Sequence, residues 1–189
     1  MSKIDKDLLE RFASDAVREG VVDVLYTRID TPIGKLFLGV TEKGLCRIAF
    51  QEEKEDETLA ELAVKLGPRI VASDRETATF RDTLGAYLEG ESTDLALPFD
   101  LSLVPSVFRR EVLETLYGIP RGEVVTYGEL ARRVDHPRAA RAAGSACARN
   151  PVPLVVPCHR VVPGSGGVGN YGGGAHRKRW LLQLEGVNR

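Results

Sequence analysis

The sequence has few of the residues that bind metals or form disulfides. Its 189 residues include three cysteines and three histidines, with no CxxC spacing and no HxxxH pair. An odd number of cysteines without paired spacing argues against a disulfide framework, and the missing ligand spacings argue against a zinc site. We therefore expect no bound metal.

Long apolar runs are lacking as well. No run approaches the roughly 18 apolar residues that a membrane-spanning helix needs, and the first twenty residues are charged throughout. They therefore do not contain the apolar core of a signal peptide. These absences predict a cytoplasmic protein without a membrane partner.

The net charge is small, but it is unevenly distributed along an otherwise ordinary globular composition. Residues 101–189 contain 13 Lys and Arg against 6 Asp and Glu, a net charge of +7. Residues 1–100 contain 13 against 21, a net charge of −8. A basic C-terminal half is typical of a protein that binds nucleic acid. The same charges can also serve only to keep surface helices solvated, and charge alone favours neither interpretation.

The N-terminal half has the pattern of a helix followed by a small sheet. Apolar residues recur at helical spacing over residues 5–18. Three strand-like runs follow, at residues 23–29, 35–40 and 45–50. Turn residues separate these runs, so we expect an antiparallel meander. The acidic residues 52–57 are expected in a solvated turn, and a helix is expected from about Phe80 to Gly90.

The C-terminal half has a helical pattern. One apolar face from Phe108 to Ile119 predicts a helix. Thr126 and Glu129 then have the spacing of a capping box, which predicts the start of a short second helix. A third helix over residues 138–149 follows a tight turn, and the two short helices together predict a helix-turn-helix.

The helix predicted over residues 138–149 has almost no side-chain bulk. Alanine, glycine and serine fill most of its positions, beside Arg138 and Arg141. Such a helix can approach either another helix of the same protein or a DNA groove closely. The two arginines favour a phosphate or base partner.

A glycine-rich run at residues 164–174 contains the literal pattern GxGxxG. Its third glycine does not open a helix, and too few residues remain to complete a βαβ unit. We therefore expect no dinucleotide and no other cofactor. The glycines instead predict a loop that wraps a flat ligand with its backbone.

The segment Pro157–Arg160 places a cysteine beside a histidine. Cys158 is either a small buried hydrophobe or a nucleophile, and a thiol hydrolase or acyltransferase is one form that a nucleophile takes. Neighbouring residues of an extended segment point to opposite sides. His159 therefore needs a turn or a bridging water to deprotonate the thiol.

Six segments in the basic half carry a specific resemblance when they are taken together. They are Tyr127–Ala131, Arg138–Arg141, Asn150–Pro153, Pro157–Val162, Gly169–Gly173 and Trp180–Leu182. With this spacing they strongly resemble the O6-alkylguanine-DNA alkyltransferases, also called methylated-DNA–protein-cysteine methyltransferases. The match is dense over residues 105–186 and looser over residues 21–100.

The resemblance implies an α+β protein in three parts. Residues 1–20 form an N-terminal helical extension outside the shared core. Residues 21–100 form a small antiparallel-sheet domain of the ribonuclease-H-like kind. Residues 101–189 form a mostly helical domain that contains the helix-turn-helix and the active site.

The resemblance also implies a DNA repair reaction by direct reversal. The alkyl group, such as methyl, passes from guanine O6 to the Cys158 sulfur by in-line displacement. Because a thioether is a poor leaving group, each protein molecule acts once. His159, oriented by Glu185, takes the thiol proton through a water, and Tyr127 helps to rotate the nucleotide and donates its hydroxyl to the base.

The implied partner is double-stranded DNA that carries O6-alkylguanine. The target nucleotide must leave the base stack, and Arg141 fills the gap. The small-residue helix enters the minor groove. The residues implied in DNA binding are Tyr127, Arg138, Ala139, Ala140 and Arg141.

The remaining implied residues surround the base or support the loop. Tyr171 lines the alkyl pocket, while the Val161 carbonyl and the Gly172 N–H recognise the guanine edge. Asn150 and Arg160 have structural roles. One branch of the family has lost the cysteine and only senses the lesion, so a non-catalytic sensor is the alternative. We expect a monomer in solution and leave cooperative binding on DNA open.

Overall fold

The computed structural model describes residues 5–188, and it divides into two compact units. Unit 1 ends at Leu103 and unit 2 begins at Val104. Residues 1–4 of the expected extension lie outside the described residues, and the division at residues 20 and 100 stays a prediction. None of the helices described here combines the length and the apolar character needed to cross a membrane.

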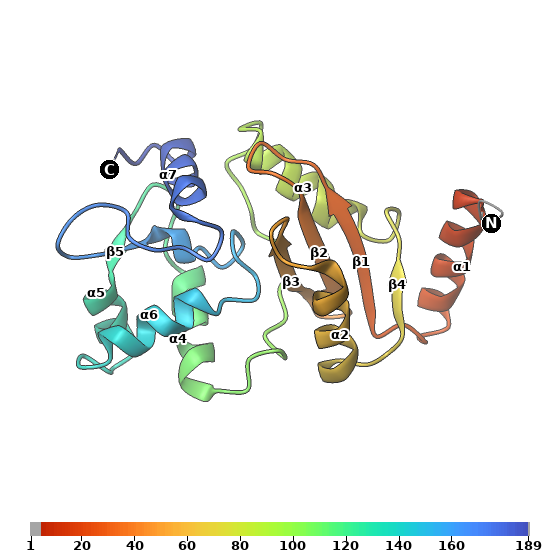
Figure 1. The fold of residues 1–189 in the computed structure, drawn as a ribbon, viewed down its shortest axis with the longest axis horizontal. Coiled ribbons are helices and arrows are strands. Elements are labelled where there is room, and N and C mark those ends of the chain that lie inside the picture. Colours follow the sequence, from red (N-terminus) through yellow and green to blue (C-terminus); the bar gives the residue numbers. More distant parts are fainter. Residues whose placement is uncertain (1–4, 189) are drawn as a thin grey trace. The chain divides into compact units, whose positions relative to one another are not determined.

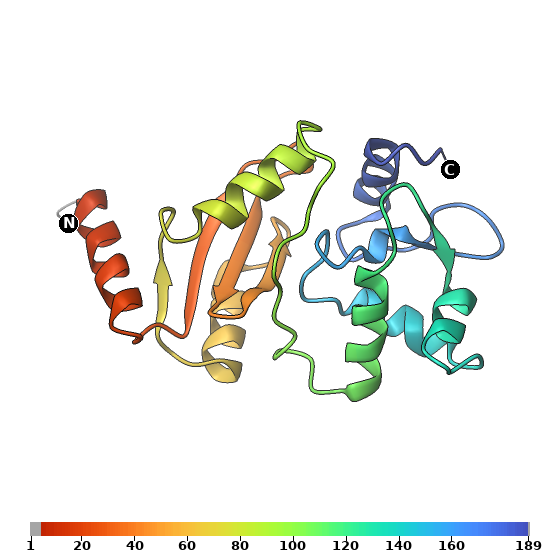
Figure 2. The same ribbon diagram turned by 180° about the vertical axis from the view of Figure 1, so that it is seen from behind.

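Unit 1 is a four-stranded sheet with a helix on each face (Figures 1 and 2). Its elements are α1 (Lys6–Arg18), β1 (Val24–Ile29), β2 (Leu36–Thr41), β3 (Gly44–Phe50), α2 (Glu55–Lys65), β4 (Ile70–Ala72) and α3 (Ala78–Leu88). The strand order is β3-β2-β1-β4, with α2 on one face and α3 on the other. The expected antiparallel meander is confirmed for β1, β2 and β3. The parallel strand β4 was not expected, because three residues carry no readable alternation.

The central strand β2 is buried on both faces, in keeping with the helices that cover them. On the α2 face, Leu62 packs with Phe37, Cys46 and Ala49 of the sheet. The turn expected over residues 52–57 is shorter than predicted, since α2 already begins at Glu55. The first turn of α2 carries three acidic residues, and negative charge is favourable at a helix N-terminus.

The expected N-terminal helix is confirmed as α1. It is attached to the turn after β4 through Glu10, whose carboxylate accepts hydrogen bonds from Ser73 Oγ at 2.5 Å and from the Asp74 N–H at 2.9 Å. Ala13 and Ala16 are its buried residues.

Unit 2 is mostly helical. Its elements are α4 (Val107–Tyr117), β5 (Val125–Thr126), α5 (Tyr127–Arg133), α6 (Ala140–Ala148), the 3₁₀ turn η1 (Cys158–Arg160), β6 (Val161–Val162) and α7 (Ala175–Leu184). The helices α5 and α6 pack together as the expected helix-turn-helix. The capping box at α5 is confirmed, with Glu129 N–H donating to Thr126 Oγ1 at 3.1 Å and Thr126 N–H donating to Glu129 Oε2 at 2.5 Å.

The helix α6 begins two residues later than predicted. The Ala139 N–H donates to the His136 carbonyl at 2.8 Å, so residues 136–139 form a turn of their own. Arg138 and Ala139 therefore precede the helix, and Ala139 is its N-cap residue.

The short parallel pair β5–β6 positions the residues of interest. Val125 pairs with Val161, and Thr126 pairs with Val162. This pairing holds the start of α5, and so Tyr127, close to the segment that follows Cys158. Residues that are 36 positions apart in sequence thus meet in this short sheet of unit 2.

Candidate active site

A cavity of about 470 Å³ lies in unit 2, with Cys158 in its wall. Its other lining residues come from α5, α6 and the glycine-rich loop: Tyr127, Gly144, Cys147, Ala148, Pro163, Gly169, Asn170, Tyr171 and Gly172. Several of these residues are glycines, so backbone forms much of the wall. A flat ligand can therefore approach the thiol closely.

The glycine-rich loop requires glycine at Gly169. Its φ of +72° lies in the left-handed region, and a Cβ at this position would lie 2.7 Å from Pro163 Cγ. A side chain would therefore force the loop open at the cavity wall.

Cys158 begins the 3₁₀ turn η1 and is only 5% exposed. Because Cys158 and His159 lie in a 3₁₀ turn and not in an extended strand, their side chains are not forced to opposite sides of the chain. Asn150 holds the thiol from the other side: its Nδ2 donates to Cys158 Sγ at 3.3 Å and to the Val156 carbonyl at 2.7 Å. Asn150 Oδ1 also accepts from the Val152 N–H at 3.0 Å.

Behind the thiol lies a fully buried cluster of His159, Glu185 and Arg160. His159 Nε2 lies 2.7 Å from Glu185 Oε1. Arg160 donates from Nε to Glu185 Oε2 at 2.9 Å and from Nη2 to Oε1 at 3.0 Å, and its Nη1 donates to the Ile119 carbonyl. The carboxylate is thus held in place by a planar guanidinium, which fixes the orientation of the imidazole.

The cluster leaves one imidazole nitrogen available. With a carboxylate at Nε2, that nitrogen carries the hydrogen and Nδ1 keeps its lone pair. His159 Nδ1 is buried and has no hydrogen-bond partner among residues 5–188. Burial lowers the pKa of His159, while Glu185 opposes this shift, so the ring is neutral near pH 7 and can accept a proton.

Burial has the opposite effect on the thiol. It raises the pKa of Cys158 to about 11, against the weaker lowering effects of the Asn150 hydrogen bond and the Lys178 charge. Cys158 is therefore a thiol at neutral pH, and it needs a base before it can act as a nucleophile. Burial, and then the neighbouring Cys158, also raises the pKa of Cys147, the second thiol in the cavity wall.

Sequence reasoning missed Lys178. This lysine is fully buried on α7, and its Nζ donates to the Val161 carbonyl at 2.6 Å and to the Asn170 carbonyl at 3.2 Å. It therefore ties β6, just before the glycine-rich loop, to Asn170 within the loop, and it brings a positive charge near Cys158. Its spacing from Leu181, Leu182 and Glu185 marks one helical face, which is the signal that could have identified it.

The two expected tyrosines both line the cavity. Burial, and then the charges of Cys147 and Cys158, raises the pKa of Tyr127. The Tyr171 ring meets the His159 ring edge-on, with centroids 6.4 Å apart. Burial also raises the pKa of Tyr171 well above its ordinary value, so both hydroxyls are protonated at neutral pH.

The other expected residues lie around this centre. Gly172 lines the cavity, whereas Val161 is buried and its carbonyl already accepts from Lys178. A carbonyl has two lone pairs, so it can accept one more hydrogen bond. Arg138 and Arg141 are exposed, and Ala139 and Ala140 are half-buried at the start of α6.

Two protein-family models together match most of the chain, one in each unit. One is described as "6-O-methylguanine DNA methyltransferase, ribonuclease-like domain" and matches residues 24–101. The other is the DNA binding domain of the same description and matches residues 107–187. The chain belongs to the 6-O-methylguanine DNA methyltransferase family.

Curated relatives and solved structures support membership of this family. The methylated-DNA–protein-cysteine methyltransferase of Mycolicibacterium paratuberculosis is 39% identical over 160 residues, covering 85% of this chain and 91% of the relative. That of Rattus norvegicus is 38% identical over 173 residues, covering 86% and 82%. The crystal structure of the Mycobacterium tuberculosis O6-methylguanine methyltransferase matches with a TM-score of 0.71 and 36% identity, covering 86% of this chain and 92% of that chain.

A second crystal structure from Mycobacterium tuberculosis, of its OGT in complex with DNA, matches with a TM-score of 0.72 at 36% identity and the same coverage. The resemblance stated from the six segments is thereby confirmed, and so is the α+β fold class. DNA binding belongs to the C-terminal domain of this family by its description, in agreement with the excess positive charge of unit 2.

Proposed function

We propose that this protein repairs O6-alkylguanine in double-stranded DNA by irreversible transfer of the alkyl group to Cys158. Family membership supports the class of reaction. The observation that carries the assignment of Cys158 is its place in the cavity wall beside a neutral, buried His159. The hydrogen bond between His159 and Glu185 supports the same assignment.

Proton removal comes first. His159 Nδ1 has the free lone pair, and one water between it and the thiol carries the Cys158 proton to the ring. Glu185 stabilises the imidazolium that forms, and Arg160 keeps the Glu185 carboxylate in position. Asn150 Nδ2 donates to the sulfur and stabilises the thiolate.

Alkyl transfer follows by in-line displacement. The sulfur electron pair forms the S–C bond as the C–O6 bond breaks, and the electron pair of that bond stays on the guanine. Tyr127 gives its hydroxyl proton to the departing base, and the proton held by His159 restores Tyr127 through solvent. The products are an S-alkylcysteine and unmodified guanine, and the thioether has no route back to a thiol.

The base reaches the thiol only outside the helical stack. Arg141 is exposed at the start of α6 and fills the gap left by the extruded nucleotide. The helix α6, which begins at Ala140 directly after Arg138 and Ala139, has little side-chain bulk, which suits the narrow minor groove.

The extruded base is then held by the cavity. Tyr171 lines the part of the cavity that holds the alkyl group. The second lone pair of the Val161 carbonyl accepts a hydrogen bond from the guanine edge, and the Gly172 N–H donates one to it. Asn150 and Arg160 keep the loop and the buried cluster in place. Each protein molecule acts once and, in this proposal, acts as a monomer.

The test compares Cys158→Ala with Cys46→Ala, a buried thiol in the core of unit 1. A duplex carrying O6-[methyl-³H]methylguanine should label the wild-type protein and Cys46→Ala, but not Cys158→Ala. Cys158→Ala should still retard the duplex in a mobility-shift assay. Labelling of Cys158→Ala would contradict the assignment and indicate Cys147, while lesion binding without labelling of the wild type would establish a sensor.

A further inference from the structure

Three exposed arginines of unit 2 have no ion-pair partner among residues 5–188. They are Arg138, Arg141 and Arg149. Exposed guanidinium groups without nearby acids are available to an external anion.

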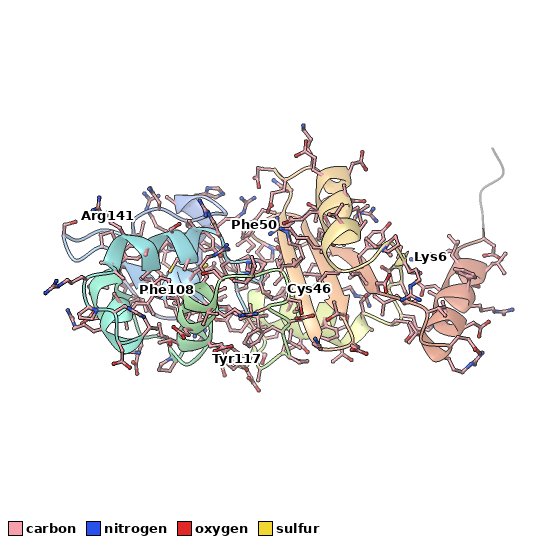
Figure 3. The ribbon with its side chains drawn as sticks, turned by 90° about the horizontal axis from the view of Figure 1, so that it is seen from below. Lys6, Cys46, Phe50, Phe108, Tyr117 and Arg141 are labelled. Carbon is pink, nitrogen blue, oxygen red and sulfur yellow. The ribbon has the colours of Figure 1, made fainter. Side chains whose placement is uncertain are left out.

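Arg141 lies in the first turn of α6, and Arg149 is the C-cap residue that ends the helix. At about 100° and 1.5 Å per residue, eight positions separate them by about 80° around the helix and about 12 Å along it. Ala142, Ser145 and Ala148 are the exposed residues between them. Figure 3 shows Arg141 projecting away from the helix. The exposed side of α6 therefore presents positive charge at both ends and small side chains in the middle.

Arg149 is held at its place by Arg109 of α4. Arg109 Nη2 donates to the Arg149 carbonyl at 2.9 Å, at the C-terminal end of α6, where the helix dipole favours a cation. Arg109 is half-buried, and its Nε is enclosed without a hydrogen-bond partner in the described chain. Burial, and then the charge of Arg149, lowers the pKa of Arg109.

The Arg109 guanidinium thus lies against the backbone of Arg149, close enough for the two positive charges to repel each other, and neither arginine forms an ion pair within residues 5–188. The repulsion is relieved when an anion binds against the exposed member of the pair. A phosphate fits this requirement, because a guanidinium offers it paired N–H donors. Both arginines lie inside the matched DNA binding domain, and Arg149 lies at the other end of α6 from Arg141.

We propose that Arg149 binds a backbone phosphate of the DNA duplex. Arg109 fixes the backbone of Arg149 through its hydrogen bond to the carbonyl, and Arg141, at the other end of α6, enters the same duplex. The phosphate contact fixes the position of α6 along the duplex and carries no sequence information. This inference rests on the proposed function, since it assumes that the exposed side of α6 meets DNA.

The test measures the salt dependence of binding to an unmodified duplex by fluorescence anisotropy. Arg149→Gln should lower the magnitude of the slope of log K against log [salt] by about 1, and weaken binding about fivefold to tenfold at 0.1 M salt. Arg149→Lys should keep the wild-type slope because it keeps the charge. Lys65→Gln, which removes one charge from unit 1, should also keep it.

A wild-type slope in Arg149→Gln would overturn the proposal, provided that its circular dichroism spectrum is native. A reduced slope in Lys65→Gln would do the same, because the effect would then follow net charge alone. Methyl transfer by the wild-type protein is measured separately. If it fails while the slopes differ as expected, the proposed function fails; if it succeeds while the slopes do not differ, only the phosphate contact fails.

Discussion

Unit 1 pairs most of its basic side chains with acids on its own surface. Arg69 lies 2.5 Å from Asp23, and Lys65 lies 2.6 Å from Glu61. Most of these pairs are well exposed, so each contributes at most about 1 kcal/mol to stability. They leave few basic side chains of unit 1 available to an outside partner, and the unit keeps an excess of acidic residues.

Unit 2 distributes its charges differently. Its carboxylate Glu185 is buried and holds Arg160 and His159. The exposed Arg138, Arg141 and Arg149, by contrast, form no ion pair within residues 5–188. The comparison teaches that net charge alone does not reveal function. What distinguishes unit 2 is that one acid, Glu185, is used inside the site, while the exposed arginines along α6 are left without an ion-pair partner in residues 5–188.

The largest effect is expected from breaking the buried cluster with Glu185→Gln. The change leaves the Arg160 charge buried without its carboxylate, so the free energy of unfolding of unit 2 should fall by about 3 kcal/mol. It also removes the group that orients and stabilises protonated His159, so methyl transfer should slow about 100-fold. Urea unfolding followed by fluorescence of Trp180, the single tryptophan and a residue of α7, measures the first effect.

The matched change in unit 1 is Glu61→Gln, which removes the acid of an exposed pair. It should alter the free energy of unfolding by less than about 0.5 kcal/mol and leave transfer unaffected. Similar losses of stability in the two variants would remove the distinction between the two kinds of charge.

Arg141→Ala should give the next largest effect. Extruding the nucleotide costs a few kcal/mol, and Arg141 offsets part of this cost by filling the gap that the nucleotide leaves. Losing this side chain should slow repair in duplex DNA about 100-fold. Reaction with free O6-benzylguanine needs no extrusion and should fall far less. Equal losses on the two substrates, measured as second-order rate constants, would remove the extrusion role.

A smaller effect is expected from Lys178→Met. The change removes a positive charge near Cys158, so the pKa of the thiol should rise above its present value of about 11. Near pH 8 the alkylation of Cys158 by iodoacetamide should slow about tenfold, and its pH profile should move to higher pH. Lys65→Met should leave the profile in place; a profile unchanged in Lys178→Met would show that the lysine acts only as a tie for the loop.

The smallest effect concerns pH and stability. Burial lowers the pKa of His159 in the folded state, so the unfolded chain binds its proton more readily. The free energy of unfolding of unit 2 should therefore fall as the pH drops below about 6.5, by at most about 1.4 kcal/mol per pH unit. His159→Gln should lose this part of the slope between pH 7 and pH 6, whereas the exposed His136→Gln should keep it.

Local signals in the sequence predicted the elements that depend on local chemistry. The spacing of Thr126 and Glu129 identified the start of α5, and the apolar periodicity identified α1 and α4. The strand β4 was missed because three residues contain no period, and its pairing with β1 depends on residues far away in the chain. The start of α6 was misplaced because Pro137 suits a turn as well as it suits a first helical turn.

The site was predicted less evenly. Cys158 and His159 were visible as neighbours, but only the resemblance suggested Glu185, since one acid on a helix looks like a surface residue until its burial is known. Lys178 was missed for the same reason, because a lysine is rarely buried. The function of both residues depends on contacts across more than fifteen positions, which no local pattern encodes.

The most direct test of the central claim is the intact mass of the protein before and after incubation with a duplex carrying one O6-methylguanine, followed by peptide mapping. The account predicts one added methyl group, located on Cys158, with no second turnover when more duplex is supplied. An unchanged mass despite tight binding to the lesion, or a methyl group on Cys147, would contradict it.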